Sequence, residues 1–355
     1  MMRKSLLLCA MLVWGVGCRI PPIPPVTTFS KVGLTGTTDV VVNMPPDADH
    51  GPMIEMPVTP FPQKCSGKIA VIDVDGLLVY EERTGLFSLG QNPVAVFREK
   101  LDYIANNPDG FCGVVLRINS PGGGVTATDI MARELIAFKA RTGLPVVSCI
   151  MAHGAGGAYY LAQASDHIVA HPTSVVGGIG VILNLYNVEG QMAQFNIFAV
   201  PIKSGKNIDL GTPTMREGET KGQRRILATM ANEFHERFIT VVKQSRPVKE
   251  EDERSNFDGR VFTAAQAYER GLIDEVGYLD EAMNRAAEMG NCQNAGLVMI
   301  HRENDPVNSP YDISPNTPLQ KTLLAVNVPG LDRSKLPTFL YLWQPEPSFA
   351  STDSP

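Results

Sequence analysis

The sequence predicts an α/β protein built on a mostly parallel β-sheet with helices on both faces. Within residues 64–302, continuous apolar runs alternate with segments of helical periodicity, the pattern of parallel strands that are buried on both faces. Glycine clusters follow two of these runs, as at the strand ends of α/β sheets. A chain of 355 residues, 44% of them hydrophobic, is long enough to bury such a core.

Each predicted element follows from its own pattern of apolar residues. The expected strands cover 68–76, 113–119, 145–152 and 167–171, and the expected helices cover 93–104, 126–142 and the stretch from Tyr159 through Ala162. Thr and Asp capping residues open the second helix, which ends at Gly143. A later long helix carries an apolar stripe at every fourth position, which indicates core or a subunit contact: Ile226, Met230, Phe234 and Phe238.

The first residues have the pattern of an export signal. A short basic start precedes an apolar stretch over 5–17, which is too short to span a bilayer comfortably. The junction at Gly17 and Cys18 resembles a bacterial lipoprotein signal, in which Cys18 becomes lipidated, although Gly15 replaces the usual large aliphatic residue. Cleavage after Gly17 and an uncleaved anchor are the alternatives. We therefore expect an exported, membrane-associated protein at the inner membrane facing the periplasm, or elsewhere in the cell envelope.

The chain divides into four predicted parts. Residues 1–17 form the signal peptide, 18–63 a Pro-rich tether, 64–302 the folded domain and 303–355 a Pro-rich tail. The tail segment "PTFLYLW" is apolar enough to dock on the domain or on a partner, and a packed segment is the favoured interpretation. A formal charge of −6 without a long basic run argues against a nucleic-acid partner.

The six cysteines give no disulfide framework. Cys112 and Cys149 lie next to or within apolar strands, where Cys is usually a small core residue. Export permits disulfides, and a Cys65–Cys292 bridge is one candidate that the sequence leaves open. The spacing of Cys and His residues predicts neither a metal site nor a cofactor.

Two glycine turns are the candidate site. "NSPGGG" (119–124) and "HGAGGA" (153–158) each follow an apolar strand, and backbone N–H groups at strand ends can hold an anion or a developing oxyanion. One such cluster alone would be an ordinary tight turn, whereas two suggest a shared cleft. The candidate binding residues in these turns are Ser120, Pro121 and Gly157.

Five motifs in one order carry a specific resemblance. "LRINSPGG", "AGGAYYLAQASDHIVAHP", "VVGGIGVI", "IKSGK" and "DGRVFTAAQAYERGLIDEVGYLDEA" together resemble peptidase family S49, the signal peptide peptidase A family, over 68–286. The resemblance implies a crotonase/Clp protease-like fold, with mostly parallel β-sheet layers flanked by helices. It also implies a membrane-tethered homo-oligomer that acts on signal-peptide remnants and other peptides, with backbone oxyanion donors at Gly122 and Gly123.

Members of this family use a Ser/Lys dyad, in which a neutral Lys takes the proton of the attacking Ser. The Ser stands in a pattern close to "AASGGYY", so aligning the tyrosines places Gly156 at the nucleophile position. The Lys stands three residues after the Gly of "SG", which places Ile208 at the general-base position, ahead of Asp209. The spacing between Gly156 and Ile208 matches that of short family members, so no gap is needed. Both halves of the dyad are therefore absent.

Neighbouring residues offer weak substitutes. Lys206 would point to the same side of an extended strand as Ile208 and is the candidate replacement base. His153 is a second candidate base, and either base would act with Ser120 as the nucleophile. Misplacing reacting atoms by an ångström costs ~10²-fold in rate, so turn or surface roles are favoured for all three.

Three functions follow from these observations. The favoured one is an exported pseudopeptidase that binds peptides or regulates an active paralogue. The alternative is an active serine-type endopeptidase with a displaced dyad. The remote alternative is a crotonase-like acyl-CoA enzyme, which the export signal and the S49 motifs oppose.

Overall fold

The computed structural model describes residues 51–58, 67–80, 91–107, 110–185, 187–214, 220–248, 253–292, 294–303 and 339–343. The predicted signal peptide, Cys18, Cys65 and most of the predicted tether lie outside these ranges. Among the helices within them, none has the length and hydropathy needed to cross a bilayer.

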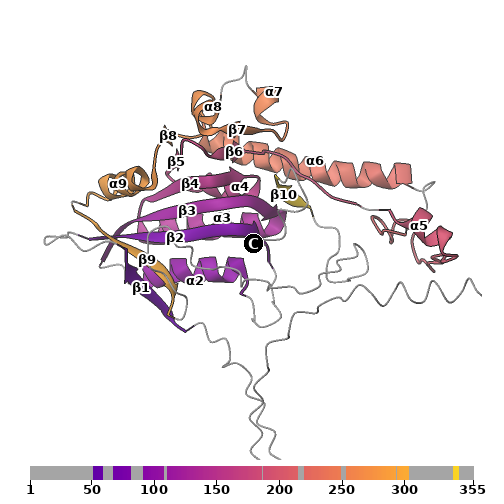
Figure 1. Ribbon diagram of the computed structural model, residues 1–355, viewed down its shortest axis with the longest axis horizontal. Coiled ribbons are helices and arrows are strands. Elements are labelled where there is room, and N and C mark those ends of the chain that lie inside the picture. Colours follow the sequence, from indigo (N-terminus) through magenta and orange to yellow (C-terminus); the bar gives the residue numbers. More distant parts are fainter. Residues whose placement is uncertain are drawn as a thin grey trace, which may run out of the picture. The chain divides into compact units, whose positions relative to one another are not determined.

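The sheet is mostly parallel, as the sequence predicts (Figure 1). Six of its strands run parallel: β9 (Gly296–Arg302), β2 (Lys68–Leu78), β3 (Phe111–Gly124), β4 (Val146–Ala155), β5 (His167–Ala170) and β8 (Glu275–Val276). At one edge β1 (Met53–Pro57) pairs antiparallel with β9. Near the other edge, β6 (Val175–Gly177) pairs parallel with β4 and antiparallel with β7 (Val261–Thr263).

Helices cover both faces of the sheet, because neighbouring apolar residues of a strand point to opposite faces. Ala70 of β2 belongs to the large core cluster under α2 (Pro93–Asn106) and α3 (Val125–Thr142). Its neighbour Ile69 belongs to the smaller cluster under α9 (Leu279–Met289). The continuous apolar runs of the sequence therefore have the burial expected of a doubly covered sheet.

The remaining helices are α4 (Gly157–Ala162), which packs on β3 and β4, α8 (Ala264–Glu269), which packs beside β6 and β7, and α5 (Glu189–Gln194), α6 (Thr220–Ser245) and α7 (Glu253–Asn256). The apolar stripe predicted on α6 is divided between two environments. Phe238 is buried and Phe234 packs against the core, whereas Ile226 and Met230 are exposed. The second half of the stripe is thus core, and the first half faces solvent.

The glycines at 122–124 form no turn, which corrects the prediction. β3 continues through Gly124, and α3 begins directly at Val125 without a side-chain cap. The reason is pairing: β2 lies opposite these glycines on one side, and a strand from the C-terminal tail, β10 (Leu340–Leu342), lies opposite them on the other.

Two strands lie outside the predicted domain limits of 64–302. β1 comes from the segment predicted as tether and β10 from the predicted tail. Both are short strands flanked by proline-rich sequence, so composition alone hides them.

The structure also corrects the expectation for Cys112. Cys112 forms a disulfide with Cys292, with 6.1 Å between their Cα atoms, because β3 begins beside the turn that follows α9. Cys149 is a free, buried thiol, as expected, and burial raises its pKa to about 12.

Candidate functional site

Gly156 forms a sharp turn between β4 and α4. Its backbone adopts φ +54° and ψ −125°, a left-handed conformation that favours glycine. Gly156 N donates to Gly177 O at 2.9 Å, and Gly156 O accepts from Tyr160 N at 3.0 Å. The chain therefore has the strand–turn–helix geometry on which hydrolases display a nucleophile, with no side chain at its apex.

A gap opens beside this turn where two neighbouring strands diverge. Pairing between β3 and β4 ends at Ser120 and Gly154, whereas the opposite edge of β4 stays paired, with β5 and then with β6. In parallel sheets, ligands bind at such points beyond the carboxyl ends of the strands. The structure thus brings the two predicted glycine clusters together at one site.

Ser120 has a structural role in this site. Its hydroxyl donates to Gly76 O at 2.6 Å and accepts from Gly122 N at 3.1 Å, and the residue is fully buried. This arrangement leaves Ser120 without an accessible attacking oxygen. It also engages the N–H of Gly122, which the sequence predicts as an oxyanion donor, so Gly123 is the remaining candidate of the pair.

The gap is filled by β10. In the antiparallel register, Tyr341 lies opposite Gly123, and Leu342 lies opposite Gly122. Figure 1 shows β10, in yellow, at the carboxyl end of β3 and beside α6. Trp343 N donates to Pro121 O at 3.0 Å, so the predicted binding residue Pro121 contacts the chain's own tail.

The predicted base positions lie elsewhere in the chain. Ile208 is 71% exposed, and Lys206 is also exposed. Both belong to the segment 187–214, which lies with α5 near the N-terminal end of α6 and away from the sheet (Figure 1). Lys203 pairs with Asp209 at 2.5 Å, and this contact lowers the pKa of the Asp209 carboxyl. Within one chain, therefore, neither lysine of the described segment 187–214 stands beside Gly156.

His153, the other candidate base, lies beside the tail. Its ring centroid is 6.2 Å from that of Trp343. Among the described residues, no group of three His, Cys, Asp or Glu side chains gathers closely enough to hold a metal ion.

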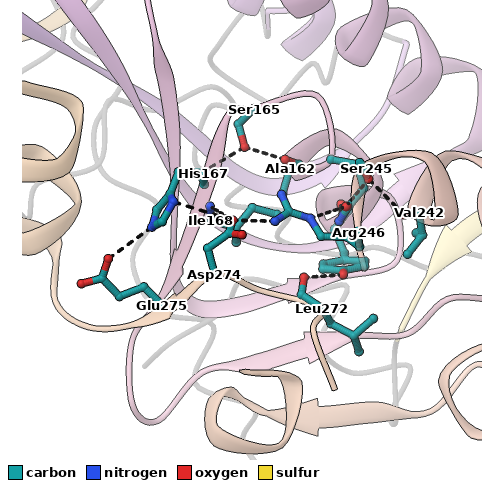
Figure 2. A network of polar contacts seen from close by, with 12 residues as sticks. Ala162, Ser165, His167, Ile168, Val242, Ser245, Arg246, Leu272, Asp274 and Glu275 are labelled. Atoms are coloured by element: carbon teal, nitrogen blue, oxygen red, sulfur yellow. Dashed lines mark hydrogen bonds and ion pairs between the residues drawn. The ribbon is translucent and has the colours of Figure 1, made fainter. Parts of the chain in front are cut away.

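A polar network that the sequence does not reveal holds α4 against the end of α6 (Figure 2). Arg246 Nη1 pairs with Asp274 at 2.5 Å, and Arg246 Nε donates to Gln163 at 3.0 Å. Asp274 also accepts from Ile168 N of β5 at 2.8 Å. Tyr159 of α4 donates to Leu272 O at 2.6 Å. The helix that follows Gly156 is therefore fixed from several sides, which keeps the turn in place.

Comparison with known proteins agrees with this geometry. A mostly parallel sheet with a sharp glycine turn between β4 and α4 defines an α/β fold. The sequence model of peptidase family S49 matches residues 139–293. The chain is 31% identical to "Putative protease MJ0651" of Methanocaldococcus jannaschii over 219 residues, which cover 62% of this chain and 69% of that protein. The chain belongs to peptidase family S49.

Two further relatives are similar over the same part of the chain. A protein of Enterococcus faecium named "Putative signal peptide peptidase SppA" is 29% identical over 61% of this chain and 62% of its own length. Protease 4 of Haemophilus influenzae is 25% identical over 63% of this chain. The chain spans 35% of the length of that Protease 4, so this similarity concerns one part of a longer protein.

Proposed function

We propose that this chain is a peptide-binding member of family S49 that does not turn peptides over efficiently. The observation that carries the proposal is Gly156 at the apex of the turn between β4 and α4. Glycine supplies no nucleophilic atom, and a gap of strand width beside it suits an extended peptide. Removing the catalytic side chains of a serine protease leaves ~10³–10⁴-fold acceleration over water, far below useful turnover.

The surroundings of the turn favour this function over a displaced dyad. Ser120 is buried and doubly hydrogen-bonded, and Lys206 lies on a different segment of the chain. A nucleophile and its base must stand within hydrogen-bond reach. The burial of Ser120 and the exposure of Lys206 on the segment 187–214 therefore favour peptide binding over a displaced dyad.

The location and partners are part of the same proposal. The basic and apolar start of the sequence supports export, with membrane attachment through the N-terminus or through lipidated Cys18. The ligands would be peptides such as signal-peptide remnants, in keeping with the name of the Enterococcus relative. The protein would act as a homo-oligomer, or together with an active paralogue.

An activity assay tests the catalytic part. The full chain is incubated with casein and with a signal peptide, and separately with a serine-reactive fluorophosphonate. We expect no cleavage above buffer and no label. Cleavage that is lost on changing Lys206 or Ser120 would establish the displaced dyad instead.

The matched gain-of-function variant is Gly156→Ser/Ile208→Lys. Because a Cβ at 156 would overlap the backbone of Tyr341, the same pair is also made with Tyr341→Ala, which removes the buried ring that holds this backbone in place. Labelling of the introduced serine by the fluorophosphonate in the triple variant is the expected sign that the turn retains nucleophile geometry.

Membrane attachment is tested separately by incorporation of labelled palmitate, which we expect to be lost in Cys18→Ser.

A further inference from the structure

The tail segment 339–343 lies in the site as an extended peptide bound on both edges. On one edge Val125 N donates to Phe339 O at 3.2 Å, and Trp343 N donates to Pro121 O at 3.0 Å. On the other edge Leu340 and Ile182 exchange two hydrogen bonds, each of 3.0 Å. Without the segment, both edges would present unpaired backbone groups. The site is therefore a groove one strand wide.

The central side chain of the segment fills a defined pocket. Tyr341 is fully buried, and its ring stacks on Tyr160, with centroids 5.3 Å apart, and lies 4.8 Å from the Phe238 centroid. Its hydroxyl donates to the backbone oxygen of Phe234 at 2.7 Å. Burial raises the Tyr341 pKa to about 12, so the phenol keeps its proton at neutral pH. The pocket thus matches both the ring and the hydroxyl of tyrosine.

A second side chain of the segment contacts the same helix. Phe339 packs edge-to-face on Phe234, with centroids 5.1 Å apart. Alternate residues of a strand point to one face, so Phe339 and Tyr341 both face α6. The groove therefore accommodates a peptide that has an aromatic residue at one position and a tyrosine two positions later.

Glycines allow the backbone of the segment to come this close. A Cβ at position 156 would lie 2.7 Å from the carbonyl carbon of Tyr341 and would also overlap its oxygen. A Cβ at position 122 would overlap that same oxygen and lie 2.6 Å from Gly157 N. The Tyr341 carbonyl therefore lies where the side chain of residue 156 would project. A serine at position 156 is incompatible with the segment in this position.

We propose that the groove is a peptide site anchored by a tyrosine side chain, and that residues 339–343 are its resident ligand. The proposal rests on the proposed peptide-binding function and specifies its ligand: an extended peptide with an aromatic residue two positions before tyrosine. An external peptide of this kind competes with the segment for both strand edges. A ligand on the same chain acts at an effective concentration on the order of millimolar, so the native chain resists weak competitors.

Trp343 reports on the position of the segment. It is half-buried beside His153, and Trp14 is the other tryptophan of the two in the sequence. In a full-length Trp14→Phe protein, all tryptophan emission therefore comes from position 343. Displacement of the segment should shift this emission to the red and increase its quenching by acrylamide.

Three variants in this background test the pocket. Tyr341→Ala should release the segment and expose Trp343, because truncating a buried aromatic anchor weakens binding by about 30-fold or more. Tyr341→Phe, which loses only the hydrogen bond to Phe234, should increase quenching less, because that loss weakens docking by about 2–10-fold. Tyr268→Ala, at an exposed position of α8, is the matched control and should leave the emission unchanged.

Binding of an external ligand completes the test. A fluorescein-labelled peptide of residues 335–346 is titrated into each protein. Binding to Tyr341→Ala should be at least about 30-fold tighter than to the parent protein, and a peptide with Ala in place of its tyrosine should not bind. Equal binding of both peptides, or a Trp343 emission that Tyr341→Ala leaves unchanged, would overturn the proposal.

Cleavage of the bound peptide is a separate result. If Tyr341→Ala binds the labelled peptide and also cuts it, the proposed lack of turnover fails while the tyrosine site stands. If neither protein cuts the peptide and Trp343 is exposed in the parent protein, the tyrosine site fails while the lack of turnover stands.

Discussion

Arg117 and Asp73 place a charged pair inside the sheet. Arg117 Nε donates to Asp73 Oδ1 at 2.6 Å, and both side chains are almost fully buried. Removing one partner of a buried pair leaves an uncompensated charge, so Arg117→Met should lower the free energy of unfolding by about 3–5 kcal/mol. Urea denaturation at pH 7 measures this loss. The double variant Asp73→Leu/Arg117→Met should recover most of it, and a double variant as unstable as the single one would contradict the argument.

The buried carboxyl group of Asp75 should make the stability of the folded protein depend on pH. Burial raises the pKa of its carboxyl, with Asn119 donating to it at 2.9 Å. A folded-state pKa above the unfolded value favours the folded state at low pH, and this contribution is lost as pH rises through the folded pKa. Asp75→Asn should therefore raise Tm at pH 7, and the gain should disappear below about pH 4.

Differential scanning calorimetry at both pH values measures this effect. Glu269→Gln, at an exposed position of α8, is the control and should change Tm little at either pH. A gain from Asp75→Asn that is equal at pH 4 and pH 7 would contradict the assignment to Asp75 ionisation.

At the scale of elements, the disulfide joins the start of β3 to the turn after α9. Its loss in Cys112→Ser/Cys292→Ser should lower stability by about 2–5 kcal/mol. Peptide mapping of the exported protein without reductant should recover Cys112 and Cys292 in one cross-linked peptide. Cys149 should resist iodoacetamide at pH 8 until the protein is unfolded, because a thiol with a pKa of about 12 carries little thiolate. Free Cys112 in the exported protein would contradict the pairing.

The predicted and observed elements differ where contacts between residues far apart in the sequence determine the local structure. Continuous apolar runs predicted β2, β3 and β4 because burial on both faces is a local sequence property. The end of β3 was predicted as a turn, because glycine-rich sequence does not reveal that β10 pairs with it. The Cys112 disulfide has the same origin, since its partner is 180 residues away.

The sequence also predicted only those parts of the candidate site that depend on local patterns. Sequence patterns identified the turn at Gly156 and the neighbouring glycines because strand ends and glycine clusters are local signals. The role of Ser120 as a hydrogen-bond partner of Gly76 and Gly122 depends on three-dimensional contacts. The occupation of the groove by Tyr341 depends on them too, and the apolar tail segment "PTFLYLW" was its one sequence signal.

At the scale of the whole molecule, the segment 187–214 exposes an apolar surface. We call this segment the arm; none of the residues of its helix, α5, is buried. Six of its apolar side chains are more than half exposed: Phe195, Ile197, Phe198, Val200, Ile202 and Ile208. Exposed Ile226 and Met230 add to this surface from α6, which begins near the arm (Figure 1). Exposed apolar side chains that cluster on one segment are typical of protein or membrane contacts, and the proposed homo-oligomer would cover those of the arm.

We therefore expect assembly of the homo-oligomer to require the exposed apolar side chains of the arm. Phe195→Asp/Phe198→Asp should convert an oligomer into monomers, because charged groups oppose burial of the apolar surface in a subunit interface. Sedimentation velocity of the detergent-free protein lacking residues 1–18 measures the change in mass. Ile136→Asp, at an exposed apolar position on α3, is the matched control and should leave the oligomer intact. Circular dichroism should show unchanged helix content in both variants, since these side chains are exposed. An arm variant that keeps the parent mass, or a monomeric parent protein, would contradict assembly through the arm.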